Sequence, residues 1–282
     1  MNKKLILLAC FWLFGAGFAH AQLKKIHSDP LIWTDLQADY FLPDQSYFFF
    51  RNQWRHNTNN DFAGLKESGP LHQFYEMYAL VGYDHRFTER WSARVFARYT
   101  FRPVNNNVFF QGALRHTGHI GSVDFIKQLA FDYIKPQLED SRGRIRPFAA
   151  LEKNFRFGNH TMRPQLSYEL FFNNDFKDEQ SGGLTRTVDR TRLRVAASYK
   201  ATPYLWITPY FMKQTDYFNV LSTFTELKDA NNNPVLDDDG NPVLVENKGG
   251  KRNRIDPVFG LDLRFIIHAG RQTDSTLPRL VR

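Results

Sequence analysis

The sequence is poor in cysteine: Cys10, close to the N-terminus, is the single thiol among 282 residues. One cysteine cannot form an internal disulfide, and it cannot supply the several thiolates of a structural zinc site. The chain also has no glycine-rich phosphate loop followed by Lys-Ser or Lys-Thr. These absences exclude disulfide-stapled scaffolds, thiolate zinc scaffolds and P-loop nucleotide-binding proteins.

Long apolar runs are missing too, except at the start of the chain. Lys3 and Lys4 precede an uncharged apolar run over 5–18, and Ala19-His20-Ala21 has the small-x-small pattern of a cleavage site. The run is shorter than the roughly 20 residues that a helix needs to cross a bilayer. We therefore predict a signal peptide over 1–21, cleaved after Ala21, rather than a membrane anchor.

A weaker alternative is lipid attachment at Cys10, because Leu7-Leu8-Ala9-Cys10 loosely resembles a lipobox. The apolar run continues past that motif, so cleavage after Ala21 is favoured, and it leaves a mature chain without thiol chemistry. Loss of Lys3 and Lys4 lowers the formal net charge from +8 to +6. The remaining basic residues are spread singly, so no nucleic-acid partner is predicted.

Aromatic residues are abundant. They make up 16% of the chain, with 27 Phe and 12 Tyr, yet the mean hydropathy is negative. Many aromatics and many charges without a long apolar run are typical of a membrane β-barrel, which has one lipid-facing side and one wet side. No stretch of the mature chain is predicted to be a transmembrane helix.

The main signal is a period of two. In 91–101 one face carries Trp91, Ala93, Val95, Ala97, Tyr99 and Phe101, while Arg94, Arg98 and, just beyond, Arg102 lie on the other. Alternate side chains of a strand point to opposite sides of the sheet. The segments 162–172, 189–199 and 259–267 alternate in the same way. A soluble β-sandwich would alternate as well, but the arginine-bearing polar faces and the aromatic strand ends favour a barrel.

Eleven segments are candidate strands: 31–42, 46–57, 72–87, 91–103, 107–116, 122–135, 143–157, 161–173, 189–201, 204–218 and 256–267. Short connections alternate with long ones at 58–71, 174–188 and 219–255, as they do between the periplasmic and outer sides of outer-membrane barrels. An N-terminus in the periplasm and an even strand number lead us to predict twelve strands, with a further one in 22–30, or else ten. The expected fold is an all-β, transmembrane antiparallel up-and-down barrel over 22–267, followed by a C-terminal tail over 268–282.

The connection 219–255 is predicted to carry a small exposed hairpin around Asp237-Asp238-Asp239-Gly240, because Asp-Gly lies between two short apolar runs. The acidic cluster lacks an oxygen ligand at Val235 for the calcium-loop pattern. A solvated turn is therefore favoured over a metal site, and no cofactor is predicted. An extracellular partner could bind through this loop.

Two resemblances concern the barrel as a whole. The segment from Gly260 to Phe265 resembles the C-terminal β-signal that outer-membrane proteins present to the barrel-assembly machinery, although residues follow it here. The layout of His85-Arg86-Phe87-Thr88-Glu89-Arg90-Trp91-Ser92, followed by 168–173 and 189–195, resembles the uncharacterised DUF2490 family of outer-membrane barrels. That resemblance implies a place in the outer membrane of a Gram-negative bacterium, in contact with its lipid, and no known activity.

If the polar faces line a lumen, ten charged residues are candidates to point into it: Arg94, Arg98, Arg102, Glu152, Glu169, Arg190, Arg192, Arg194, Asp262 and Arg264. Glu76 and Asp132 could share that space. Buried charges need partners or water, so we favour a lumen filled by Arg–carboxylate pairs and a structural or interaction role. A narrow anion-favouring channel is the first alternative. An outer-membrane lipid hydrolase using His119 and Ser122 is the second, and an enzyme is not the favoured reading.

Overall fold

The structure is a computed structural model that describes residues 24–59, 65, 73–158, 160–175, 186–229, 233–237 and 241–268. The predicted signal peptide and nearly all of the predicted C-terminal tail lie outside these residues. The described residues form these strands: β1 Lys24–His27, β2 Leu31–Phe41, β3 Tyr47–Asn57, β4 Phe74–Arg86, β5 Trp91–Phe101, β6 Asn107–Ile120, β7 Val123–Pro136, β8 Arg142–Glu152, β9 Phe155–Phe157, β10 His160–Asp175, β11 Val188–Lys200, β12 Leu205–Val220, β13 Thr223–Glu226, β14 Leu244–Asn247 and β15 Gly250–His268. No helix that could span a membrane occurs among them.

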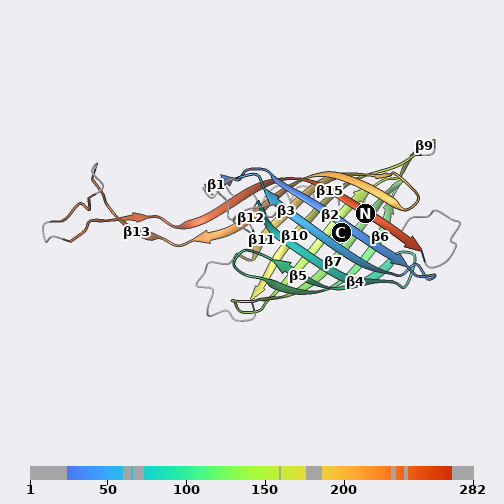
Figure 1. Ribbon diagram of the computed structural model, residues 1–282, viewed down its shortest axis with the longest axis horizontal. Coiled ribbons are helices and arrows are strands. Elements are labelled where there is room, and N and C mark those ends of the chain that lie inside the picture. The colour runs from blue at the N-terminus through green and yellow to red at the C-terminus, as the bar shows by residue number, and fades with distance from the viewer. Residues whose placement is uncertain are drawn as a thin grey trace, which may run out of the picture.

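The predicted all-β barrel is confirmed. Successive strands pair side by side from β2 to β8 and on through β10, β11 and β12 to β15, and β15 then pairs with β2 to close the cylinder (Figure 1). All neighbouring strands of the wall are antiparallel except β15 and β2, which run parallel. The strands are tilted, because the register is staggered around the wall. If each residue is traced to its partner on the next strand, a path that starts at Phe41 arrives in β1, many residues before Phe41 in the chain.

The wall has eleven strands among the described residues, so the prediction of twelve, or ten, is wrong in number. The eleven candidate segments correspond one by one to these strands. An odd number of strands is possible because β15 and β2 pair in parallel, whereas a wall of antiparallel pairs alone needs an even number. The extra strand expected in 22–30 exists only as the short β1, which pairs with 252–255 of β15. β2 pairs with the following part of β15, so β1 and β2 lie one after the other along the same side of β15 and do not form two separate wall strands.

The two ends of the barrel differ in their connections. At one end, called here the short-turn end, β2 and β3, β4 and β5, β6 and β7, and β11 and β12 are joined by a few residues each. The opposite, long-loop end carries the connections 58–73, 176–187 and 221–249. Because β2 starts at the long-loop end and runs parallel to β15, the chain enters the wall there, contrary to our expectation of a first strand that starts at the short-turn end.

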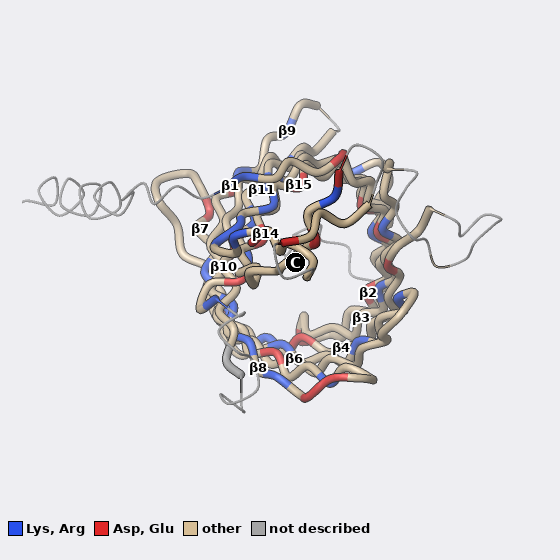
Figure 2. Tube along the Cα trace, turned by 90° about the vertical axis from the view of Figure 1, so that its left-hand side faces the viewer, with Lys and Arg blue, Asp and Glu red and all other residues tan. Residues whose placement is uncertain are grey.

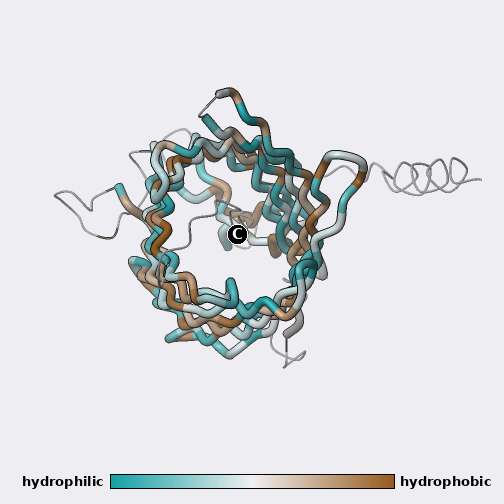
Figure 3. Tube along the Cα trace, turned by 90° about the vertical axis from the view of Figure 1, so that its right-hand side faces the viewer, coloured by the Kyte–Doolittle hydropathy of each residue, from teal (hydrophilic) through white to brown (hydrophobic). Residues whose placement is uncertain are grey.

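Side chains alternate between a charged inner face and an apolar outer face. Along β5, Ser92, Arg94 and Thr100 are buried, whereas Val95 and Phe101 are exposed. Charged residues recur all around the wall (Figure 2), and hydrophilic positions alternate with hydrophobic ones along it (Figure 3). The strand period therefore produces two chemically different surfaces from one sheet.

The described residues of 221–249, called here the arm, project from the long-loop end beyond the pairing of β12 with β15 (Figure 1). Within the arm β13 pairs with β14. Farther along the arm, three backbone hydrogen bonds of 2.8 Å connect three valine and leucine residues. The N–H of Leu227 donates to the carbonyl of Val243, that of Val243 to the carbonyl of Val235, and that of Val235 to the carbonyl of Leu227. Leu236 and Pro242 also form an antiparallel bridge, which agrees with the predicted hairpin, although its tip at 238–240 lies outside the described residues.

Candidate functional site

The candidate site is the charged interior of the barrel. The ten residues predicted to face a lumen occupy inward positions of β5, β8, β10, β11 and β15, in phase with the buried side chains of the same strands. Arg94, Glu152, Glu169, Arg194 and Arg264 are buried. Arg102 lies just after β5 at the long-loop end, where its side chain is 39% exposed and contacts Glu76 at 2.5 Å.

Two pairs form within the predicted set. Arg194 Nη2 lies 3.0 Å from Asp262 Oδ2, and Arg192 Nη1 lies 3.8 Å from Glu169 Oε2. Four further members have partners outside the predicted set. Arg94 pairs with Asp84 at 2.9 Å, Arg190 with Asp216 at 2.5 Å, Arg163 with Glu152 at 3.9 Å, and Arg264 with Asp39.

Most of the interior ion pairs include at least one residue that was not predicted from the sequence. Asp35, Asp39, Arg51, Arg144 and Arg146 all face inward and belong to these pairs. Their signal was present: Arg142, Arg144 and Arg146 alternate along one strand, and Asp35 and Asp39 share the face of Trp33 and Phe41. Apolar residues on the same inner face hid that signal, because a face carrying Trp33 and Phe41 reads as lipid-facing.

Hydrogen bonds and one ion pair join many of these side chains into one chain across the wall, called here the polar belt. It runs from Gln111 to Asp132, Arg146, Glu169, Arg192, Gln214 and Asp256, one residue from each successive strand from β6 to β15. The links range from 2.5 Å between Gln111 and Asp132 to 3.8 Å between Arg192 and Glu169. Ser28, between β1 and β2, donates to the last carboxylate at 2.5 Å.

Aromatic rings fill the space between the belt and the opposite wall. Phe171 is 1% exposed, and the guanidinium carbons of Arg144, Arg146 and Arg192 each lie 4.9 Å from its ring centroid. Arg55 lies 3.9 Å from the ring of Trp33. Cation–π contacts of this kind are worth about 2 kcal/mol when desolvated. Together with the carboxylates they offset the cost of removing the arginines from water.

Arg98 differs from its neighbours. It makes no hydrogen bond or ion pair with a described residue, its Nε is buried without a partner, and it stacks on Phe109 at 3.7 Å and on Tyr78 at 5.0 Å. It lines a central cavity of about 110 Å³ together with Trp33, Phe148 and Gln165. That volume holds only a few water molecules, at roughly 30 Å³ for each.

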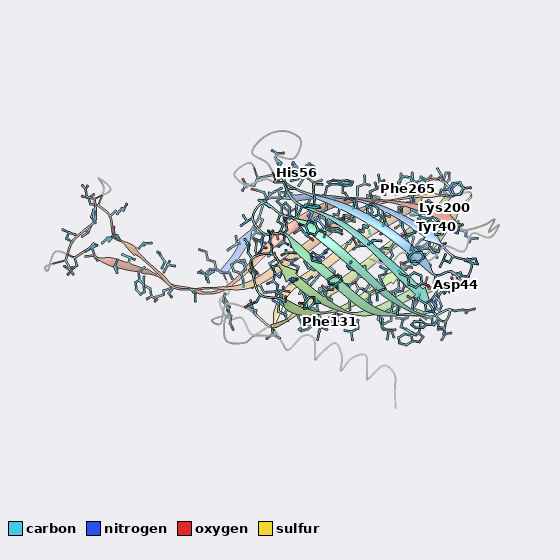
Figure 4. The ribbon with its side chains drawn as sticks, turned by 60° about the horizontal axis from the view of Figure 1, so that its bottom comes forward. Tyr40, Asp44, His56, Phe131, Lys200 and Phe265 are labelled. Carbon is cyan, nitrogen blue, oxygen red and sulfur yellow. The ribbon has the colours of Figure 1, made fainter. Side chains whose placement is uncertain are left out.

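A much larger cavity, of about 730 Å³, opens at the short-turn end and is called here the vestibule. Asp44 and Lys200 belong to its lining, and Figure 4 shows both at the end of the barrel opposite His56. Six cationic and four acidic residues line it: Arg86, Arg90, Arg115, Arg156, Arg163 and Lys200, with Asp44, Asp84, Glu89 and Asp124. The vestibule is therefore an open, net-positive space above the filled centre.

The residues of the enzyme alternative lie at this end. His119 Nδ1 contacts Asp124 at 2.6 Å. Ser122 is exposed in the two-residue turn that it forms with Gly121, whose φ of 60° suits such a turn. The structure thus directs His119 towards a carboxylate and not towards the hydroxyl.

A serine–histidine contact does occur elsewhere at this end, where Ser46 lies 3.1 Å from His85 Nδ1. Ser46 is fully buried, donates to Asp44 at 2.9 Å and accepts from the backbone of Arg86 at 3.2 Å, so it fixes the turn between β2 and β3. Hydrogen bonds from the hydroxyl and the N–H of Ser46 hold the pKa of Asp44 below its usual value.

No group of three or more His, Cys, Asp or Glu residues that could hold a metal ion occurs in the part of the chain that the structure describes. The chain matches no protein-family model and no curated protein. The interior must therefore be interpreted from its own geometry: a filled polar centre, an open vestibule at one end and a projecting arm at the other.

Proposed function

We propose that the protein is an outer-membrane barrel of a Gram-negative bacterium, closed at its centre, that holds the arm at the cell surface for interaction with an extracellular partner. The observation that carries the proposal is the polar belt, since a pore would need the space that these paired side chains occupy. Membership of a DUF2490-like family, export by a cleaved signal peptide and assembly through Gly260 to Phe265 are parts of the same proposal.

The outer wall supports a place in lipid. Phe48, Val95, Leu129 and Phe259, on four separate strands, are each more than half exposed, and all point away from the interior. A soluble monomer rarely exposes a contiguous apolar patch of more than about 300–600 Å². An apolar surface that follows the strands around a cylinder is instead what a bilayer solvates, and a closed barrel leaves no unpaired strand edge in the hydrocarbon.

The interior supports a structural role over transport. Each belt residue has a partner on a neighbouring strand, and an unpaired buried charge would cost several kcal/mol. Moving one arginine aside to admit a solute would leave its carboxylate partner buried without a counter-charge, and this would also cost several kcal/mol. Ion pairs with fitted geometry and aromatic neighbours make the centre rigid and not readily opened.

The arm supports an interaction role. It exposes Leu221, Phe224 and Leu244, each about 60% accessible, away from the outer wall that contacts lipid. Apolar side chains held on a hydrogen-bonded projection are suited to contact another macromolecule. The conventional placement of short turns in the periplasm would put the arm outside the cell.

Planar-bilayer recordings of the refolded chain test the closed centre. We expect no discrete conductance steps from the wild-type protein. A Trp33→Ala, Tyr78→Ala double variant should conduct, because both rings line the central cavity, and it verifies that the assay detects an opened barrel.

Protease treatment of intact cells tests the arm: cleavage within 221–249 is expected, and cleavage only after the outer membrane is permeabilised would place the arm in the periplasm and contradict the proposal.

A narrow anion channel is the second candidate, and Arg98 favours it, since an unpaired cation beside the central cavity would attract anions. Steps in the wild-type recordings that reverse at the chloride potential would establish this function and overturn the closed centre. If Arg98→Met abolished that selectivity, the cation would be assigned as its source.

A further inference from the structure

We propose that the vestibule is a binding site for a small organic phosphate, with Arg115 and Ser92 as the pair that holds the phosphate group. The proposal does not depend on whether the centre conducts or on what the arm binds. It rests on a buried serine hydroxyl and a buried guanidinium nitrogen that have no hydrogen-bond partner among the described residues and whose side chains line the same open cavity.

Arg115 and Ser92 face each other across β6 and β5, as partners in the strand register. Both line the vestibule. Ser92 is 4% exposed, and its hydroxyl makes no hydrogen bond; Nη1 of Arg115 is buried and also has no partner. Buried polar groups are nearly always hydrogen-bonded, and leaving them unpaired costs about 1–3 kcal/mol each. A ligand that accepts from both groups would remove that cost.

The ligand must be an anion because of the charges around the pair. Arg90, Arg156 and Lys200 also line the vestibule, and like Arg115 they make no side-chain hydrogen bond or ion pair with a described residue. Six cations line the vestibule against four carboxylates, and one of these carboxylates, Asp84, is already paired with Arg94. The cations therefore outnumber the carboxylates that could neutralise them.

A phosphate group suits this arrangement. A guanidinium donates through a planar fork to two oxygens of a phosphate, and a serine hydroxyl can donate to a third. The cavity of about 730 Å³ is far larger than an inorganic ion and lies within the range of roughly 300–1,000 Å³ typical of small-molecule sites. The phosphate could belong to a soluble metabolite or to a lipid headgroup.

Titration of glucose 6-phosphate into the refolded full-length chain in a zwitterionic detergent tests the site. We expect saturable binding by isothermal calorimetry, weakened at least about tenfold in Arg115→Met and several-fold in Ser92→Ala, in line with the loss of a charged and of a neutral hydrogen bond. Glucose itself should not bind. Micelles doped with phosphatidic acid replace the sugar phosphate in a second arm, and stronger binding there would assign the phosphate to a lipid.

Arg98→Met is the matched control. It removes the same charge from an arginine that also lacks a carboxylate partner but lines the central cavity and not the vestibule. We expect wild-type affinity for that variant. Arg115→Lys keeps the charge but not the planar fork, so it should bind with intermediate affinity. It replaces Arg115→Met if that variant does not refold. Refolding is judged by circular dichroism and by the change in mobility between unheated and heated samples on gels.

The proposal is overturned if neither phosphate arm binds to the wild-type chain, or if Arg98→Met weakens binding as much as Arg115→Met. In the first case the vestibule is only a solvated basic mouth. In the second, binding reflects the overall charge of the barrel and not a site at Arg115 and Ser92.

Discussion

The ion pair between Arg264 and Asp39 links β15 to β2 across the parallel seam, and we expect it to be the most sensitive single contact of the barrel. Asp39 is fully buried and Arg264 is 4% exposed. Substitution of Arg264 by Met would leave a buried carboxylate whose remaining side-chain hydrogen-bond donor is the amide of Gln37, at 2.8 Å.

The expected loss follows from the burial of both groups. Removing one partner of a buried pair costs about 3–5 kcal/mol, because the other charge stays behind without compensation. The double variant Asp39→Leu, Arg264→Met leaves no charge and should recover most of that loss. Arg254→Met is the control, since Arg254 also bridges to a carboxylate, Asp216, but is 46% exposed, and exposed pairs contribute about 0–1 kcal/mol.

Equilibrium unfolding by guanidinium in detergent measures these differences. Trp33 and Trp206 are 3% and 1% exposed, so their fluorescence reports on the interior. A loss below about 1 kcal/mol in Arg264→Met, or a double variant as unstable as the sum of its single changes, would refute the view that the seam depends on this pair.

Three further outcomes are expected. Gly260→Ala should destabilise the barrel by about 1–3 kcal/mol, because its Cβ would overlap the buried ring of Tyr210; an unchanged unfolding midpoint would argue against that close contact. Deletion of 223–247 should leave the melting profile of the barrel unchanged, since the arm packs outside the wall. Ser46→Ala should raise the pKa of Asp44 towards its ordinary value, because the mutation removes the hydroxyl hydrogen bond, and an NMR titration that finds no rise would contradict this cause.

The wall of the barrel could be predicted from the sequence because each strand spans two environments. Segments such as 91–101 alternate cleanly, since Val95 contacts the outside while Arg94 and Arg98 lie within. The strand number could not be predicted, because the pairing of β15 with β2 joins the two ends of the chain and leaves no local signature. Both strands look the same whether their partner runs parallel or antiparallel.

The site was predictable only in part, for a related reason. Alternation assigns a side chain to a face, so Arg194 and Asp262 could be assigned inward positions, but it does not say which partner lies across the barrel or two strands away. The links of the polar belt depend on register around the whole wall. The vestibule pair was missed because neither Arg115 nor Ser92 is unusual by itself; their meaning comes from facing each other without partners.

The seam also constrains how the barrel forms. Every other pair in the wall joins strands that follow one another in the wall without a wall strand between them in the sequence, so those pairs can form more locally and earlier. Asp39 and Arg264, by contrast, are separated by 225 positions. Bringing such distant points together costs conformational entropy, so we expect the pairing of β15 with β2 to be the last step of folding. Until that step, the sheet is open and its two unpaired edges can pair with another molecule.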